Sequence, residues 1–199
     1  KKGLFSQSLK ILDKAKETAK ANQKFNFLTL VLALEKRIEM LHITRSMQNR
    51  AEQLSHESDV VNASLALVNR LSNLSLQLYS WYIQHGHARN EKDLKSLKLF
   101  FDNSFPAEAS QAKGFYEKLY LYQSYCWFAF IRLDFLQYYR YCQKWVDLFT
   151  SYPEMLPVET ASYIKGMHNL MGAHFDLLNH EKLAETIKEF EKFARHKLV

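Results

Sequence analysis

The chain has 199 residues, enough for one large helical domain or two small ones. Its five glycines and three prolines are too few for the many turns of a β-rich protein. The net charge of +6 is spread along most of the chain. The most apolar run, at residues 25–34, is about half as long as the ~20 residues that a membrane span requires. A β-rich fold and a transmembrane helix are therefore excluded.

The number of cysteines indicates whether the protein belongs to a reducing or an oxidising compartment of the cell. The chain has two cysteines, Cys126 and Cys142, which form neither a disulfide framework nor a metal-binding set. Both are explained as small, polarisable core residues. A reducing compartment fits this usage best, and we expect a cytoplasmic protein.

Apolar residues recur three and four positions apart along most of the chain, the spacing that lines one face of an α-helix. The short connection at residues 22–24 favours antiparallel packing of its two helices. The pattern predicts an all-α protein with helices at about residues 5–21, 25–41, 45–85, 91–101, 108–132, 135–151, 158–178 and 180–196. In the third helix we expect a kink or break at residues 55–58, and Gly86 at its end.

The second half of the third helix carries a long apolar stripe and almost no charge. Between Val60 and Ala88 the only formal charge is Arg70, whereas a solvent-facing helix normally carries more. Members of the stripe alternate four and three positions apart: Val60, Ser64, Leu67, Leu71, Leu74, Leu78 and Trp81. We expect both faces to be covered within the chain. A homodimer with Val60–Ile83 as a coiled-coil seam is the alternative.

The clearest internal boundary is at residues 102–106, which combine a capping-type residue with Asn103, Ser104 and a proline. We expect an N-terminal helical part with long helices at residues 1–103. Helical hairpins should follow at residues 104–199. The two parts are predicted to form one continuous domain.

Two segments share the spacing of a repeat made of two helices. At residues 3–15 a glycine is followed two positions later by Phe5, and the segment ends at Ala15, a small residue that lets two helices approach closely. At residues 171–175 an apolar residue, a glycine and an aromatic residue occur in the order expected for a first helix. Leu183 and Ala184 then lie near the small position of the second helix.

A third segment, Tyr122–Tyr152, fits the same spacing with larger residues. Cys126 and Ala129 occupy small positions in its first helix, while Tyr138 stands where alanine is usual. Together, residues 3–21, 113–152 and 160–193 resemble tetratricopeptide repeats. The long helices between residues 25 and 101 depart from this pattern.

The resemblance implies antiparallel helical hairpins stacked as a right-handed superhelix, an α-solenoid. Residues 1–3 would be the turn inside a repeat whose first helix is missing. We therefore expect the chain to be a portion of a longer protein, or its preceding residues to be disordered.

The densest aromatic segment is Phe115–Tyr152, with 15 aromatic residues in 38 positions. Most of these rings must pack between helices. In tetratricopeptide repeats the first helices line a groove that binds an extended or helical peptide. The resemblance places six residues toward such a groove: Tyr120, Gln123, Trp127, Phe130, Asn169 and Asp176. Asn169 matches, by position, the asparagine that bonds the peptide backbone in this family.

Catalytic and metal-binding residues form no recognisable set. His85 and His87 flank Gly86, but no Cys, Asp or Glu stands at ligand spacing beside them. The chain has no phosphate-binding glycine loop, no dinucleotide fingerprint and no Gly-x-Ser-x-Gly. We expect no enzyme activity, no cofactor and no metal.

Three functions remain. The first is a scaffold that binds a protein or peptide in its groove. The second is a regulator that contacts nucleic acid through two basic faces, Lys10, Lys14, Lys16 and Lys20 and then Arg89, Lys92, Lys95 and Lys98. We expect no nucleic-acid partner, because these basic residues and the aromatic rings occupy different segments. The third is self-assembly through Val60–Ile83.

Overall fold

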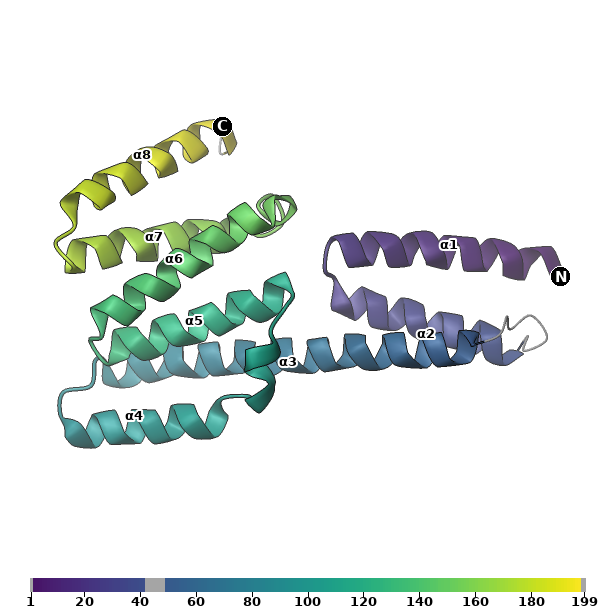
Figure 1. Cartoon of the computed structure of the whole chain (residues 1–199), viewed down its shortest axis with the longest axis horizontal. Coiled ribbons are helices and arrows are strands. Elements are labelled where there is room, and N and C mark those ends of the chain that lie inside the picture. Colours follow the sequence, from purple (N-terminus) through teal and green to yellow (C-terminus); the bar gives the residue numbers. More distant parts are fainter. Residues whose placement is uncertain (1, 42–48, 198–199) are drawn as a thin grey trace. The chain divides into compact units, whose positions relative to one another are not determined.

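The computed structural model describes residues 2–41 and 49–197, and within these ranges the chain contains no strand. The predicted all-α class is confirmed (Figure 1). The helices are α1 (Lys2–Ala21), α2 (Phe25–Leu41), α3 (Arg50–His85), α4 (Glu91–Ser104), α5 (Phe115–Ile131), α6 (Phe135–Ser151), α7 (Thr160–Asp176) and α8 (His180–Lys197). Two short 3-10 helices, Ala107–Gln111 and Pro153–Met155, lie between them.

Tertiary contacts divide the chain into two compact units, Lys1–Asn69 and Arg70–Val199. The helix α3 runs across the division, so its first 20 residues belong to the first unit and its last 16 to the second. The boundary predicted between residues 103 and 104 lies inside the second unit, at the end of α4. A single continuous domain stays a prediction.

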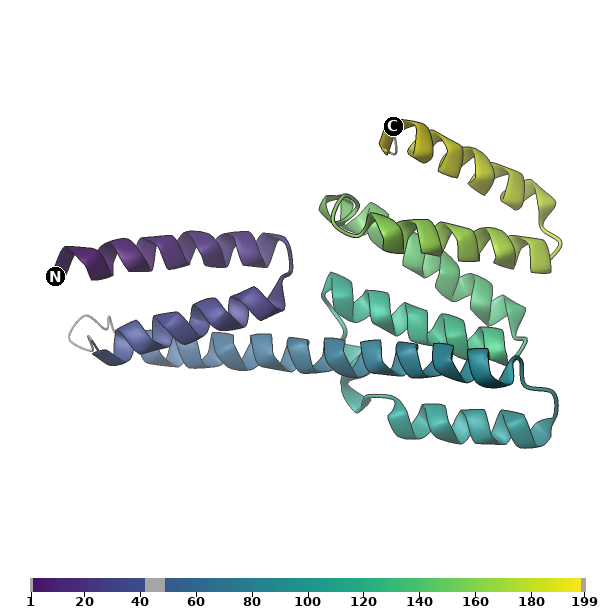
Figure 2. The same cartoon turned by 180° about the vertical axis from the view of Figure 1, so that it is seen from behind.

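The first unit is a helical hairpin packed on the beginning of α3. The helices α1 and α2 lie side by side and are joined by a tight turn (Figures 1 and 2). Its apolar core takes one residue from α1, two from α2 and two from α3: Ala19, Leu28, Leu32, Leu54 and Val61. The core is small, so charged side chains fill part of the interior.

Those charged side chains form a network that links all three helices of the first unit. Glu35 of α2 is fully buried and pairs with Lys16 of α1 and with Arg50 of α3, whose Nη2 lies 3.5 Å from Glu35 Oε1. Lys16 Nζ also lies 3.1 Å from Glu57 Oε2, and Lys20 binds the other oxygen of Glu57. Burial raises the pKa of Glu57, but hydrogen bonds from Lys20 and Lys16 outweigh it, so the pKa is lowered overall.

The prediction that Lys16 belongs to a solvent-exposed basic face of α1 is therefore wrong. Its side chain is buried against two carboxylates instead of facing solvent. The cause is a partner from a distant part of the chain, because Glu57 lies 41 positions away. Lys10 and Lys14 remain exposed.

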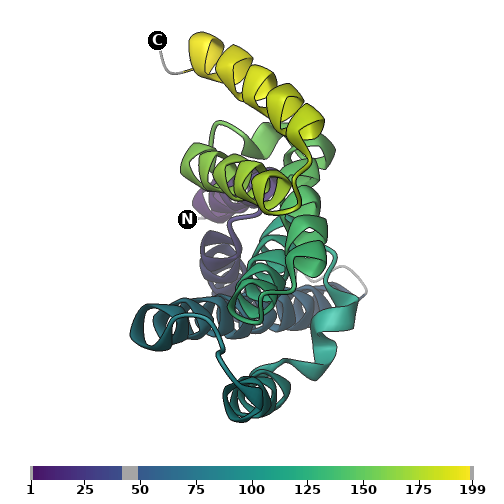
Figure 3. The same cartoon turned by 90° about the vertical axis from the view of Figure 1, so that its left-hand side faces the viewer.

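The second unit is a succession of helices, with α4 and α8 at its opposite ends (Figures 1 and 3). Each of α5, α6 and α7 packs on the next helix in the chain. The largest core cluster joins α5, α6 and α7 around Phe115, Trp145 and Met167. A second cluster joins the end of α3 to α4 and α5 through Leu78, Phe101 and their neighbours.

Three helical hairpins share one turn geometry. After α1, α5 and α7 a single residue adopts a positive φ: Gln23 (50°), Leu133 (57°) and Leu178 (56°). In each turn the next amide donates to the carbonyl five residues back, as in Lys24 N to Ala19 O at 2.9 Å and Asp134 N to Ala129 O at 3.0 Å. The third turn repeats it with Asn179 N and His174 O, at 2.9 Å. All three are Schellman turns.

Several predicted helix ends differ from those in the structure. The helix expected from residue 108 begins at Phe115, because Glu117 Oε2 accepts hydrogen bonds from the amides of Lys113 (2.7 Å) and Gly114 (3.0 Å) and so caps the helix there. The expected break at residues 55–58 is absent, since α3 is helical throughout. Residues 45–48, expected in the same helix, lie outside the described residues. Gly86 ends α3 with a φ of 72°, as predicted.

The turn expected at Gly3 is also wrong, because α1 already begins at Lys2. Gly3 and Leu4 therefore belong to the first turn of the helix. A glycine inside a helix costs about 1 kcal/mol relative to alanine, which a helix of 20 residues tolerates.

Close packing between α6 and α7 depends on Gly166. A Cβ atom on Gly166 would lie 3.2 Å from Cδ1 and Nε1 of the Trp145 ring. Trp145 is almost completely buried, so the ring has no room to move away. On the same helix, Gly172 has open space around its Cα.

We expect Gly166→Leu to lower the free energy of unfolding by roughly 2 kcal/mol, because the side chain overpacks the site against Trp145. The matched control is Gly172→Leu, which should raise it by roughly 0.5–1 kcal/mol through helix propensity alone. Urea denaturation followed by circular dichroism measures both. Equal effects of the two substitutions would contradict the packing.

We expect Glu35→Gln to destabilise the first unit by roughly 3 kcal/mol, because it leaves buried cations without their carboxylate. Hydrogen exchange of the α1 and α2 amides reports this locally. Glu91→Gln is the control, since the pair of Glu91 with Lys95 is exposed and should contribute less than about 1 kcal/mol. Unchanged exchange in Glu35→Gln would show that the network does not hold the unit together.

Candidate functional site

The four residues predicted on α5 lie on one side of that helix. Tyr120, Gln123, Trp127 and Phe130 are spaced three, four and three positions apart, which places them on one face. All four are partly buried. Their contacts decide which of them are available to a ligand.

Trp127 lies in a row of side chains that crosses three helices. Its ring centre is 4.8 Å from that of Tyr79 and 5.7 Å from that of Tyr82, both on α3. The Lys165 ammonium of α7 lies 5.4 Å from the centre of the Tyr79 ring and 5.6 Å from that of Trp127. These distances allow cation–π attraction. Tyr79 and Lys165 both remain exposed.

Two further contacts tie α5 to α7 and to the segment before it. Gln123 Nε2 donates to Ser162 Oγ at 3.5 Å, a long hydrogen bond. The Tyr116 hydroxyl donates to Glu159 Oε1 at 2.7 Å. Burial and this acidic neighbour raise the pKa of Tyr116 well above its ordinary value. Tyr120 is affected in the same way, since burial and then Glu159 raise its pKa.

The serine beside Gln123 ties α5 to α3. Ser124 Oγ lies 3.2 Å from the carbonyl of Leu71 and 2.8 Å from the carbonyl of Tyr120. The end of α3, α5 and α7 are thus joined in sequence by side chains. We call the surface that carries Tyr79, Trp127, Gln123, Lys165 and Asn169 the α3–α5–α7 face.

Phe130 has a different environment from Trp127. Its ring lies 4.7 Å from that of His87, 5.2 Å from that of Tyr82 and 5.0 Å from that of Tyr138. His87 Nδ1 is also 2.9 Å from the Phe130 carbonyl oxygen. The surrounding rings show that Phe130 packs between helices.

The two residues predicted on α7 differ in exposure. Asn169 is partly buried and its Oδ1 lies 3.5 Å from His168 Nδ1, whereas Asp176 is exposed in the last turn. Both residues share one face of α7 with Lys165, because Asn169 follows Lys165 by four positions and Asp176 follows Asn169 by seven. Asn169 and Asp176 therefore belong to the same side of α7 as the cation above Trp127.

Sequence reasoning did not identify Tyr79, Ser162 and Lys165. Tyr79 was missed because the third helix departs from the repeat pattern. Ser162 and Lys165 were detectable, since they precede Asn169 by seven and four positions and so share its face.

Groups with catalytic potential are buried in the second unit. Cys126 Sγ lies 3.7 Å from Cys142 Sγ, and both thiols are buried. Burial, followed by the neighbouring thiol, raises the pKa of Cys126. Desolvation lowers the pKa of His174 and Lys182 lowers it further, which outweighs the opposite effect of Glu185.

The turn after α3 holds a polar hollow of about 610 Å³, lined by residues that include His85, His87 and Asp93. The His85 ring packs edge-on against Trp81 at 5.2 Å, and the His87 ring packs in the same way against Tyr82 at 5.3 Å. Within residues 2–41 and 49–197, no group of three His, Cys, Asp or Glu side chains could hold a metal ion. These aromatic contacts account for the positions of the His85 and His87 rings.

Known protein families, curated proteins and solved structures give no match to this chain. Among the described helices, none has both the length and the apolar character needed to cross a membrane.

We expect the thiols of Cys126 and Cys142 to be unreactive toward 5,5′-dithiobis(2-nitrobenzoate) at pH 8 in the folded protein. Both are buried, and the raised pKa of Cys126 keeps this thiol protonated at that pH. Absorbance of the released thionitrobenzoate should rise only when urea unfolds the chain. Rapid labelling of the folded protein would contradict the buried arrangement.

Proposed function

We propose that the second unit is a tetratricopeptide-like stack whose α3–α5–α7 face binds a peptide segment of another protein without catalysis. In this arrangement α3–α4, α5–α6 and α7–α8 are successive hairpins. The first helix of each hairpin lines one face, and the second helix supports it from behind. The right-handed superhelix implied by the resemblance is part of the proposal.

The repeated turns support a repeat architecture. The α5–α6 and α7–α8 hairpins coincide with two of the segments that resemble tetratricopeptide repeats, and their Schellman turns match. The α1–α2 hairpin of the first unit has the same turn, although only residues 3–21 of it resemble the repeat and α2 departs from the pattern. Within the second unit the two turns are 45 positions apart, at Leu133 and Leu178, and such recurrent local geometry is what stacked hairpins require.

The single observation that carries the binding proposal is the row formed by Tyr79, Trp127 and Lys165. It joins three successive first helices, and its outer members remain accessible to solvent. Aromatic rings offer contact area with little loss of side-chain entropy, and Tyr and Trp add a hydrogen-bonding tip.

Apolar side chains extend this face along α3. Leu76 and Ile83 are 65% and 64% exposed and are spaced with Tyr79 at three and four positions. Leu71, Leu74 and Leu78 lie on the opposite, buried side of the helix. An apolar strip beside polar amides such as Gln123 and Asn169 suits a peptide that presents both side chains and backbone.

Self-association through Val60–Ile83 stays a prediction. The stripe that suggested a coiled-coil seam is largely buried within the chain, because Leu67, Leu71, Leu74 and Leu78 are all buried. A dimer would therefore have to use the other side of α3, where Leu76 and Ile83 are exposed.

Nucleic-acid binding has less support than peptide binding. In the first unit Lys16 is buried against carboxylates, and the exposed Lys20 is paired with Glu57, so the basic surface of α1 is reduced. In the second unit, Lys144 lies 5.1 Å from the centre of the Tyr141 ring, and Arg132 lies 4.9 Å from that of Phe128. These cations already stack on the protein's own rings.

The test is selection of a random peptide library, displayed on phage, against the full chain. A recovered peptide, labelled with a fluorophore, is titrated with the protein and with Leu76→Ser and Lys165→Glu variants. Both changes are at exposed positions, so folding should persist, and each should weaken binding about tenfold or more.

The matched control is Leu99→Ser on α4, a side chain 63% exposed and outside the α3–α5–α7 face. It should leave the affinity unchanged. Failure to recover any peptide, or equal affinity for all three variants, would reject the face as a binding site.

A further inference from the structure

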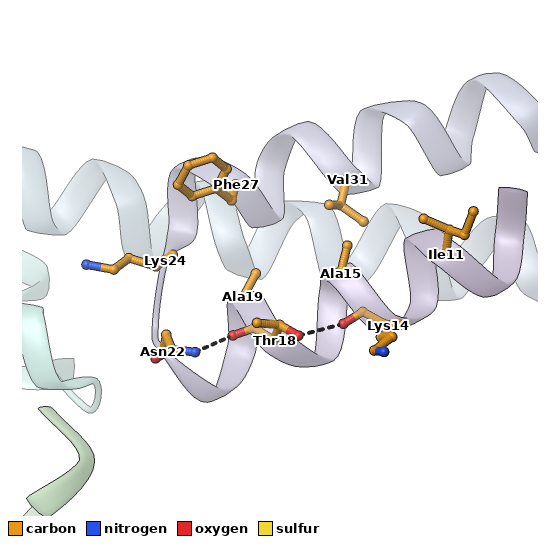
Figure 4. A pocket seen from close by; sticks show the side chains of 9 residues that line it. All are labelled: Ile11, Lys14, Ala15, Thr18, Ala19, Asn22, Lys24, Phe27 and Val31. Carbon is orange, nitrogen blue, oxygen red and sulfur yellow. Dashed lines mark hydrogen bonds between the residues drawn. The ribbon is translucent and has the colours of Figure 1, made fainter. Parts of the chain in front are cut away.

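The outer surface of the α1–α2 hairpin contains a second hollow, of about 600 Å³ (Figure 4). Its apolar lining consists of Ile11, Ala15 and Ala19 from α1 with Phe27 and Val31 from α2. These residues all belong to the first unit, so the site is separate from the α3–α5–α7 face. We call this hollow the α1–α2 groove.

Polar side chains within the α1–α2 groove are turned toward their own helix. Thr18 Oγ1 donates to the Lys14 carbonyl and Asn22 Nδ2 to the Thr18 carbonyl, each at 2.9 Å (Figure 4). Because these hydrogen bonds satisfy both groups locally, the interior of the groove presents mainly apolar surface.

Apolar side chains continue beyond the α1–α2 groove on the same sides of both helices. Ile11 and Phe27 are 69% and 65% exposed. Further exposed members, at helical spacing, are Leu4 on α1 and Leu30, Leu34 and Leu41 on α2. So much exposed apolar surface around a hollow is typical of an interaction site.

The dimensions fit an α-helix. The apolar stripe on α1 from Leu4 to Ala19 covers 15 residue steps, or roughly 22 Å at 1.5 Å per residue. Ala15 and Ala19 are one turn apart and small, so the backbone of a third helix can approach there. Ile11 on α1 and Phe27 on α2 rise toward opposite ends of the groove, and we call them its two walls (Figure 4). An amphipathic helix lying in a groove is a common mode of recognition.

Charge determines the chemistry of that helix. Lys14 and Lys24 line the α1–α2 groove, and its lining contains neither Asp nor Glu. The acidic residues Asp13 and Glu17 of α1 lie on the opposite side of the helix, because each residue advances by about 100°. A helix with acidic residues beside its apolar stripe would complement this rim.

Two other occupants fit less well. A second copy that used the same surface would place two basic rims against each other, since a two-fold interface pairs a surface with itself and both charged residues of the lining are lysines. A lipid surface is flat and would leave the hollow unfilled. We propose that the α1–α2 groove docks an amphipathic α-helix of another protein, one that carries Asp or Glu on both sides of its apolar stripe.

The probe is a synthetic 18-residue peptide with leucine at helical spacing, glutamate flanking the leucines and alanine elsewhere. Its partner peptide has lysine in place of every glutamate. Fluorescence anisotropy with the full chain should show saturable binding of the glutamate peptide, at least about tenfold tighter than the lysine peptide. Added salt should reduce the difference.

Variants of the chain locate the binding. Ile11→Ser and Phe27→Ser remove the two walls, and each should weaken binding of the glutamate peptide about tenfold. Both residues are well exposed, so the hairpin should still fold. Met40→Ser is the matched control, because Met40 is 71% exposed on α2 but points away from the groove by helical spacing. It should bind like the wild type.

Charge is tested separately. Lys14→Glu should reverse or abolish the preference for the glutamate peptide, whereas Lys98→Glu makes the same change in net charge on α4 and should not. Leu76→Ser should have no effect, so failure of this proposal is distinguishable from failure of the α3–α5–α7 face.

The proposal is overturned if neither peptide binds saturably, or if both peptides bind equally. It is also overturned if Ile11→Ser and Phe27→Ser retain the affinity shown by Met40→Ser. Finally, wall-dependent binding to vesicles of phosphatidylserine and phosphatidylcholine, or a wall-dependent dimer in sedimentation velocity, in place of peptide binding, would assign the groove to a membrane or to a second copy.

Discussion

The packing of Trp145 against Gly166 sets the spacing of the second unit. A fully buried indole on α6 fits beside α7 only because that position of α7 has no side chain. With this spacing, Phe149 of α6 reaches Tyr163 of α7 at 5.2 Å between ring centres, and Tyr163 reaches Phe193 of α8 at 4.8 Å. Aromatic rings from neighbouring helices thus contact one another continuously from α6 to α8, ring edge against ring face.

The same packing leaves a minority of rings available for recognition. Phe130 is enclosed by His87, Tyr82 and Tyr138, whereas Trp127 is reached from outside by Lys165. Two residues on one face of one helix therefore have different roles, because His87 of the turn after α3 and Tyr138 of α6 close around the end of α5 but do not reach Trp127. The two proposed surfaces differ accordingly: one uses rings and amides, and the other uses aliphatic side chains with a basic rim.

The class and most of the helices were predictable because apolar spacing is a local property. The bounds of α6 match the predicted residues 135–151, and Asp134 caps that helix by accepting from the Gln137 amide. Burial of Lys16 could not be predicted, because it depends on Glu57, a residue 41 positions away. Among the site residues, Tyr79 contacts Trp127 across 48 positions of sequence, and no periodicity links the two.

The recurrent Schellman turns have a consequence for how the chain tolerates rearrangement. In all three, two amide-to-carbonyl bonds close the link within six residues, so the direction in which the following helix leaves is decided locally. A hairpin could therefore be duplicated, excised or exchanged as a block, provided that the cut falls between hairpins and spares the link itself. Cuts inside the link would instead break the two bonds that help to hold the left-handed residue, Gln23, Leu133 or Leu178, in an unfavourable conformation.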